Sequence, residues 1–254
     1  MDRMAVDLVD EYRKQRAWRP WSAVFRLLPD VSGQTVLDLG CGIGDQAAEL
    51  SDRDATVIAV DRNDVLLDFA RARAIPRVEF RNADIGRMEL ETRASGIWCS
   101  FAGAYLPDLR SVLRHWRSLL TPGGWILLTE VDDLFEHQPT RSRTREVLTA
   151  YTRAALEAGR YDFQMGRKLR GYLEDAGFFV QKEVRCEDEE LAFQGPASEE
   201  VISAWRARFE RMRSLQDFCG GEFEDITKDF LRCLSASDHC CGASVQACVA
   251  RCAE

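Results

Sequence analysis

The chain has 254 residues, of which 46% are hydrophobic and 30% charged, and its net charge is −8 at pH 7. This composition is that of a soluble globular protein with one sizeable core, and the acidic balance argues against a protein that holds nucleic acid through its phosphates. No apolar run is long enough to span a membrane and no signal peptide is recognisable, so we expect the nine cysteines to be reduced thiols in the cytoplasm.

The N-terminal segment is predicted to be helical. Residues 2–28 carry apolar side chains at helical spacing, which indicates one or two amphipathic helices, and Pro20 indicates a break near the middle. Three aromatic residues belong to this segment: Tyr12, Trp18 and Trp21. The simplest interpretation is that they pack the segment on the rest of the protein.

A strand, a glycine turn and a helix are predicted over residues 35–50. The apolar run 35–39 is typical of a buried strand, and three glycines follow it at alternate positions, Gly40, Gly42 and Gly44. This order opens a nucleotide-binding β-α-β unit, because glycines let the backbone approach a ligand closely. Asp38 is a poor neighbour for a pyrophosphate and suits a cationic or hydroxylated ligand. The spacing also differs from the G-x-G-x-x-G pattern, which argues against an NAD-dependent oxidoreductase.

Two further predicted strands end in a carboxylate. The strand 55–61 ends in Asp61, at the distance expected of a ribose-binding acid. The strand 78–85 contains Asp84, which can accept a hydrogen bond from an exocyclic amine while Ile85 packs on the ring. Together with the acid of the first strand, three carboxylates reach one edge of a sheet. A phosphate-free ligand with an ammonium, a sulfonium, a ribose diol and an adenine fits them, and S-adenosylmethionine is such a ligand.

The following segment completes a known pattern. Residues 96–101 predict a fourth strand, 106–120 a helix and 125–131 a fifth strand. The chain resembles the class I S-adenosylmethionine-dependent methyltransferases, and its small-molecule branch, in four motifs that occur in the same order. These motifs are Val36–Gly44, Val60-Asp61, Asn82-Ala83-Asp84-Ile85 and the segment Leu119–Glu130 with its Pro-Gly-Gly turn.

The resemblance implies an α/β fold with a doubly wound, seven-stranded, mostly parallel sheet, whose sixth and seventh strands pair antiparallel at one edge. It implies a single domain with a helical cap (1–30), a cofactor-binding core (31–135), a helical substrate-shaping insertion after the fifth strand (136–176) and C-terminal strands and helices (177–254). We predict the remaining helices at 140–158, 165–176, 198–218 and 226–234, and the last strand at 243–251.

The resemblance also implies a role for each motif in binding S-adenosylmethionine. Asp38 would hold its ammonium, directly or through water, and the glycines would wrap the methionine part. Asp61 would bind the ribose diol, and Asp84 with Ile85 the adenine. The full predicted cofactor set is Asp38, Gly40, Cys41, Gly42, Gly44, Asp61, Arg62, Asp84, Ile85, Ser100 and Phe101.

The end of the fourth strand bears on the acceptor. Many amino- and base-methylating relatives carry an Asn- or Asp-Pro-Pro-aromatic motif there, whereas this chain has Ser100-Phe101-Ala102-Gly103. This difference argues against methylation of a base nitrogen or of a protein glutamine.

In the family that the chain resembles, the N-terminal cap covers the cofactor pocket. The three aromatic residues of the cap in this chain are therefore candidates to close over the substrate. Candidates for an apolar acceptor wall, with core packing as the alternative, are Tyr161, Phe163 and Met165.

Three residues are candidates for catalysis: Glu130, His137 and Tyr12. Glu130 ends the fifth strand at the edge where open α/β sheets bind ligands, and His137 follows with an ordinary pKa near neutral. The alternatives are that Glu130 caps a helix or is solvated and that His137 is simply exposed. No strong base is obligatory, since holding acceptor and methyl at attack distance already lowers the barrier.

The C-terminal cysteines are predicted to be small buried residues rather than a metal site. Paired C-x-x-C motifs are absent, and the adjacent Cys240 and Cys241 are awkward ligands for a tetrahedral ion.

Taken together, the motifs predict an enzyme, a monomer or homodimer, that methylates an oxygen, nitrogen or carbon of a small organic acceptor. The alternatives are an RNA or protein methyltransferase, and a non-methylating S-adenosylmethionine-binding protein.

Overall fold

One seven-stranded sheet forms the centre of the protein, whose computed structural model describes residues 3–253. The sheet order is β3-β2-β1-β4-β5-β9-β7, and every neighbouring pair is parallel except those made by β9. This confirms the predicted doubly wound sheet and the antiparallel pairing of its sixth and seventh strands. The strands are β1 (Thr35–Leu39), β2 (Thr56–Asp61), β3 (Val78–Asn82), β4 (Ala94–Ser100), β5 (Leu120–Asp132), β7 (Phe179–Cys186) and β9 (Ser244–Arg251).

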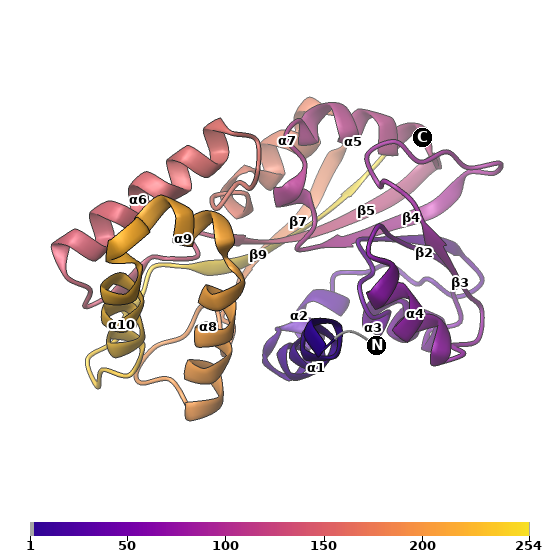
Figure 1. Ribbon diagram of the computed structural model, residues 1–254. Coiled ribbons are helices and arrows are strands. Elements are labelled where there is room, and N and C mark those ends of the chain that lie inside the picture. The colour runs from indigo at the N-terminus through magenta and orange to yellow at the C-terminus, as the bar shows by residue number, and fades with distance from the viewer. Residues whose placement is uncertain (1–2, 254) are drawn as a thin grey trace.

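Helices cover both faces of this sheet (Figure 1). On one face lie α2 (Trp21–Phe25), α3 (Asp45–Asp52) and α4 (Asp64–Ala72), and on the other lie α5 (Leu109–Ser118) and α7 (Leu169–Asp175). Side-chain caps fix where two of them begin. Asn63 Oδ1 accepts hydrogen bonds from the N–H groups of Val65 and Leu66 at the start of α4, and Asp108 accepts one from Ser111 at the start of α5.

A separate helical lobe projects beyond the carboxyl end of β5 (Figure 1). It consists of α6 (Ser142–Glu157), α8 (Glu199–Arg211), α9 (Arg213–Cys219) and α10 (Phe223–Leu234). Phe135 lies at its centre, within 6.4 Å, between ring centroids, of five other aromatic rings: Tyr151, Phe163, Trp205, Phe209 and Phe230. The single helix predicted over 198–218 is two helices, because Met212 has a non-helical ψ of 67°.

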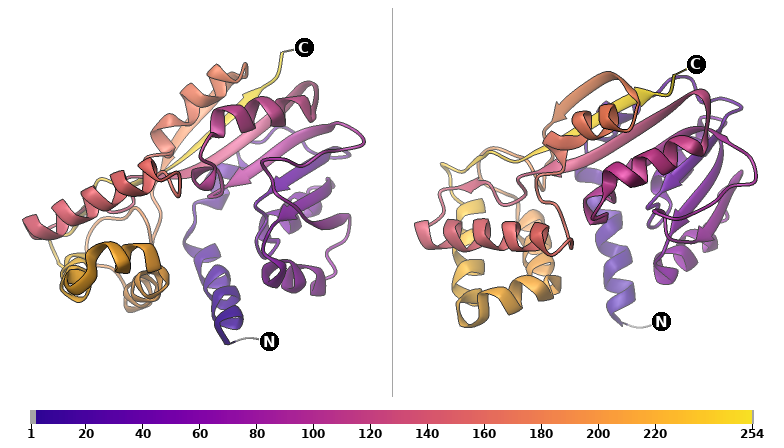
Figure 2. Two further views of the ribbon diagram at one scale, coloured as in Figure 1. Left: turned by 45° about the horizontal axis from the view of Figure 1, so that its top comes forward. Right: turned by 90° about the horizontal axis from the view of Figure 1, so that it is seen from above.

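The N-terminal helices lie between this lobe and the helices α3 and α4 (Figures 1 and 2). The break between α1 (Arg3–Trp18) and α2 falls at Pro20, as predicted. Val9 of α1 packs with Ile43 and Leu66, so α1 covers the loop that follows β1. Within residues 3–253 no helix is long and apolar enough to cross a membrane.

The segment boundaries expected from the sequence stay a proposal, to which the packing adds one detail. Both α6 and α7 fall within 136–176, yet α6 packs in the helical lobe and α7 packs on the sheet beside α5. The predicted insertion therefore contributes to two different hydrophobic clusters. A short ladder of β6 (His137–Gln138) with β8 (Cys240–Cys241) joins the start of this segment to the chain just before β9.

Gly96 provides a test of how closely β4 and β5 are packed. Gly96 is paired with Trp125, and a Cβ at residue 96 would overlap the indole ring, whose Nε1 donates to Gln34 Oε1 at 3.0 Å. We expect Gly96→Ala to lower the free energy of unfolding by about 1–3 kcal/mol in urea denaturation. Gly171→Ala is the control, because no atom lies within 4 Å of its added Cβ. Equal stability of the two variants would contradict this account.

Candidate functional site

A cavity of about 190 Å³ lies at the carboxyl ends of β1, β2, β4 and β5. Its lining combines three regions that are far apart in the sequence. The first is the glycine loop with Asp61, the second is the segment after β4, and the third comes from α1, the helical lobe and the loop before it. The lining residues predicted for the site are Tyr12, Gly40, Cys41, Gly42, Asp61, Ser100, Phe101 and Tyr161, and Trp21 also lies there.

The glycine loop takes a conformation that side chains disfavour. Gly40, Gly42 and Gly44 all have positive φ, between 52° and 79°. A Cβ on Gly40 would lie 2.5 Å from Cβ of Ala102, so the loop after β1 contacts the segment after β4 without space for a side chain. On the opposite side the N–H groups of residues 40 and 41 both donate to the carbonyl of Val60, which ties the loop to β2.

Asp61 connects the glycine loop to the start of α4. Its Oδ2 accepts a hydrogen bond from the N–H of Gly42 and its Oδ1 accepts one from Asn63, both at 2.9 Å. The other predicted adenosine contacts do not line the cavity. Arg62 is exposed, Asp84 is exposed with its Oδ1 bound to the N–H of Gly86, and Ile85 packs in the core cluster beside α5.

Asp38 lies buried beneath the glycine loop, with 2% of its surface exposed, and outside the cavity lining. Its Oδ2 has no hydrogen-bond partner among the described residues. Burial, and next the charge of Asp61, raise its pKa to about 8. The carboxyl group is therefore mostly protonated at neutral pH unless a cationic group comes to it.

The end of β4 places two side chains in the cavity, those of Ser100, its last residue, and of Phe101, which follows it. Ser100 Oγ is buried without a hydrogen-bond partner among the described residues. Phe101 has a φ of 55°, unusual for a residue with a side chain, and its ring lies 5.9 Å from that of Trp21, between centroids. Backbone strain of this kind collects at functional sites, where the surrounding structure holds it in place.

Glu130 supports this segment from below. It is 1% exposed and does not line the cavity, and its Oε1 accepts a hydrogen bond from the N–H of Ala104 at 3.2 Å. Its Oε2 has no partner among the described residues. Burial raises the pKa of this carboxyl to about 8, although the nearby backbone N–H groups oppose the shift. A direct catalytic role for Glu130 stays a prediction, and the observed contact is a positioning one.

His137 lies in the helical lobe, away from the cavity lining. Its Nδ1 is 2.9 Å from Nε2 of His239, and its Nε2 is 3.7 Å from Sγ of Cys241. Burial, and next the proximity of His239, lower its pKa to about 3. Catalysis by His137 thus stays a prediction without support from its position. Among residues 3–253 no group of three metal-binding side chains comes together.

Three tyrosines and two arginines complete the acceptor side of the cavity; the tyrosines are Tyr12, Tyr105 and Tyr161. Tyr12, 41% exposed, lies across the mouth of the cavity, and a Cβ on Gly42 would be 3.4 Å from its ring. Surrounding protein, and next Tyr105 and Asp61, raise the pKa of its hydroxyl to about 12. Sequence reasoning missed the two arginines, Arg19 and Arg208, because polar helix residues ordinarily face solvent.

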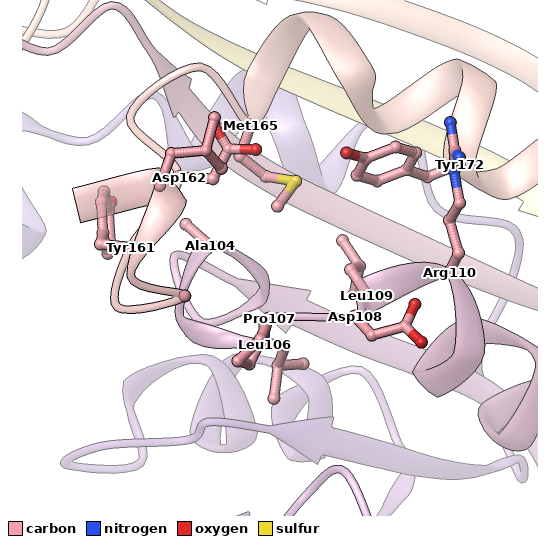
Figure 3. A pocket seen from close by; sticks show the side chains of 12 residues that line it. Ala104, Leu106, Pro107, Asp108, Leu109, Arg110, Tyr161, Asp162, Met165 and Tyr172 are labelled. Carbon is pink, nitrogen blue, oxygen red and sulfur yellow. The ribbon is translucent and has the colours of Figure 1, made fainter. Parts of the chain in front are cut away.

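A second cavity, of about 210 Å³, lies behind the segment after β4 (Figure 3). It is bounded by the start of α5, by α7 and by the turn 159–162, with Arg110 beside Tyr172. Of the three acceptor-wall candidates, Tyr161 lines both cavities, Met165 lines only this one and Phe163 packs inside the helical lobe. The glycine loop does not reach this second cavity.

Comparisons with known proteins agree with this geometry. Residues 36–124 match the family model described as "Methyltransferase domain". Over 163 residues the chain is 31% identical to a trans-aconitate 2-methyltransferase of Methylobacterium radiotolerans, a match that covers 63% of this chain and 60% of that protein. The chain spans about half the length of the curated relatives it matches.

Two solved structures show the same fold. Phosphoethanolamine N-methyltransferase 2 of Haemonchus contortus, in complex with S-adenosyl-L-methionine, has a TM-score of 0.60 at 19% identity, over 92% of this chain and 52% of that one. The cyclase SpnF has a TM-score of 0.54 at 17% identity, over 87% and 76%. Residues 36–124 therefore carry a methyltransferase domain, and the whole chain has the fold of the class I S-adenosylmethionine-dependent methyltransferases.

Proposed function

We propose that the chain transfers the methyl group of S-adenosylmethionine to a small organic acceptor. The observation that carries this proposal is the cavity in which the glycine loop and Asp61 meet an aromatic chamber made by the cap and the helical lobe. Relatives named for trans-aconitate and for ubiquinone biosynthesis support a small acceptor. A cytoplasmic location and a monomeric or dimeric state belong to the same proposal.

The residues present fit the cofactor. Two buried oxygens without partners among the described residues, Asp38 Oδ2 and Ser100 Oγ, lie at the edge of the sheet where the methionine part would bind. The absence of a side chain at Gly40 and Gly42 leaves the backbone open to a ligand. Asp61 lines the cavity, as expected of a carboxylate that binds ribose hydroxyls. When bound, the cofactor supplies a methyl group on a positively charged sulfur.

The chain's own residues orient the reactants and exclude water. Tyr12, Trp21 and Phe101 enclose the region beside the glycine loop. Arg62, Asp84 and Ile85 remain proposed contacts for the outer, adenosine end, since they lie beyond the cavity lining. Glu130 binds the backbone N–H of Ala104, three residues after Phe101, so it supports the segment that follows β4.

Two alternatives remain distinct from this proposal. An RNA or protein acceptor is disfavoured because α1, the segment 101–105 and α8 all contribute to the cavity wall and leave a small enclosed volume. A non-methylating use of the same cofactor has a precedent for the fold alone in the cyclase SpnF, at 17% identity. Methyl transfer to any acceptor separates the proposal from this second alternative.

Replacing Asp61 tests the cofactor site. Asp61→Ala removes the acceptor that holds the N–H groups of Gly42 and Asn63, so we expect S-adenosylhomocysteine to bind at least tenfold more weakly in calorimetric titration. The control is Asp68→Ala, which changes an exposed acid on the following helix, α4, and should leave the affinity unchanged. We expect the unaltered protein to bind S-adenosylhomocysteine and not NAD. If the folded protein does not bind S-adenosylhomocysteine, the proposal is wrong.

The protonation of Asp38 predicts how affinity varies with pH. Below its pKa of about 8 the free protein carries a neutral carboxyl, and an ammonium bound beside it favours the carboxylate, so binding releases a proton. We expect affinity for S-adenosylhomocysteine to increase between pH 6 and pH 7.5, by at most about tenfold per unit. Asp38→Asn removes this dependence. Calorimetry in two buffers with different ionisation enthalpies counts the protons, and a pH-independent affinity would refute the assignment.

The supporting role of Glu130 predicts a change in stability with pH. Its folded pKa of about 8 lies above the ordinary value of 4.5, so its contribution is complete below pH 4.5 and is lost as pH rises towards 8. We therefore expect Glu130→Gln to gain stability relative to the unaltered protein between pH 5 and pH 8 in urea unfolding. Glu157→Gln, at an exposed position, shows no such trend. A more than 100-fold loss of turnover in Glu130→Gln at pH 7 would instead support direct catalysis.

A further inference from the structure

The arginines at the acceptor end of the cavity are charged groups for which the cofactor has no use, and one of them has a buried donor without a partner among the described residues. Arg208, on α8, lines the cavity together with Tyr12, Tyr105 and Tyr161. Resting on the proposed function, we propose that the acceptor is a small carboxylic acid, bound by Arg208 and methylated on a carboxylate oxygen to give a methyl ester.

Arg208 is held by a buried ion network. Its Nη2 donates to Oε1 of Glu190 at 2.5 Å, and Oε2 of Glu190 accepts from Nη2 of Arg19 at 2.7 Å. Arg19 in turn donates through Nη1 to Asp188 at 3.0 Å. The side chains of both acids are fully buried. This network joins the end of α1, the loop before α8 and α8 itself, so it fixes the guanidinium in place before any ligand arrives.

The guanidinium keeps donors that the protein does not satisfy. Its Nε is buried without a hydrogen-bond partner among the described residues, and the hydrogen bonds that the structure gives for Arg208 go to Glu190 alone. The ring of Trp205 covers one face, with its centroid 5.1 Å from Cζ. A buried donor without an acceptor is unfavourable, and an arginine fork is well matched to a carboxylate. An anionic group of the acceptor supplies what is missing.

The charged groups that reach the cavity wall favour an anion, because the acids that pair with its arginines, Glu190, Asp188 and Asp45, lie behind the wall. The charged side chains that face it are the arginines at 16, 19 and 208 and the single acid Asp61. Asp61 lies beside the glycine loop, at the cofactor end, and each of its oxygens already accepts a backbone N–H. An ammonium acceptor would meet Arg208 without any free carboxylate to balance it, whereas a carboxylate meets a cation.

At the acceptor end of the cavity, away from Asp61, no lining side chain among residues 3–253 is suited to take a proton from an acceptor. The surrounding protein raises the pKa of the hydroxyls of Tyr12, Tyr105 and Tyr161 and of the thiol of Cys41. These groups are therefore neutral near pH 7. An alcohol or phenol would have to lose a proton to water, while a carboxylate is already the nucleophile.

The reaction is balanced without a base. One carboxylate oxygen forms a bond to the methyl carbon, and the bond from that carbon to sulfur breaks with its electron pair returning to sulfur. The negative acceptor and the positive sulfonium become a neutral ester and a neutral thioether, and no proton is released. The role of Arg208 is to bind the carboxylate and hold one of its oxygens in line with the bond that breaks.

The test uses S-adenosylmethionine with a labelled methyl group and a panel of small mono-, di- and tricarboxylic acids. Each acid is paired with its amide and with the corresponding alcohol, and primary amines complete the panel. We expect label in acids alone, in a product that releases labelled methanol in mild alkali. Label in alcohols, amides or amines but in no acid overturns the inference and leaves the proposed function standing. Failure to methylate any acid also overturns it.

Variants of two arginines on α8 then test whether Arg208 binds the acceptor. With the acid that reacts best, Arg208→Gln should lower kcat/KM at least 100-fold while the affinity for S-adenosylhomocysteine stays within twofold, and Arg208→Lys should recover part of the loss. Arg206→Gln, exposed on the same helix, should change neither quantity. Unaltered kcat/KM in Arg208→Gln removes Arg208 from acceptor binding. A separate result, that the unaltered protein does not bind S-adenosylhomocysteine, would contradict the proposed function itself.

Discussion

The close approach of Gly40 to Ala102 is the contact on which the cavity depends. β1 and β4 are neighbours in the sheet, but the chain leaves them towards opposite faces, into α3 and towards α5. Ligand crevices in open α/β sheets form where the chain divides in this way. Here the two loops approach each other closely at Gly40 and Ala102, because residue 40 has no side chain. That contact sets Ser100 and Phe101 beside the glycine loop and gives the crevice a floor.

Buried carboxyl groups are stabilised in two different ways around this floor. Asp38 and Glu130, beside the sheet, have few donors, and burial raises the pKa of each to about 8. Glu190, in the loop before α8, has the opposite environment. Burial alone would raise its pKa, but Arg208 and Arg19 outweigh burial and lower it to about 2. Asp38 and Glu130, behind the cavity wall, are thus neutral before a cation arrives, whereas Glu190 is ionised and paired with Arg208 and Arg19.

The parts of the site that sequence reasoning reached are those that local chemistry determines. The positive φ at Gly40, Gly42 and Gly44 and the carboxylate at the end of β2 follow from short motifs, and so do the strands on either side. The role of Arg208 could not be predicted from the sequence, because its position depends on Glu190 and Arg19, which come from distant segments. His137 was misleading for the same reason, since only packing with His239 and Phe230 places it inside the helical lobe.

The place of β9 in the sheet has a consequence for how the protein is made. β9 pairs with residues 125–132 of β5 on one side and with β7 on the other, although it is the last strand of the sheet to leave the ribosome. Until residues 244–251 emerge, β5 has an open edge and β7 has no partner in the sheet. An exposed strand edge is where chains pair wrongly with one another. The interval between synthesis of β7 and of β9 is therefore the stage at which the nascent chain most needs protection from aggregation.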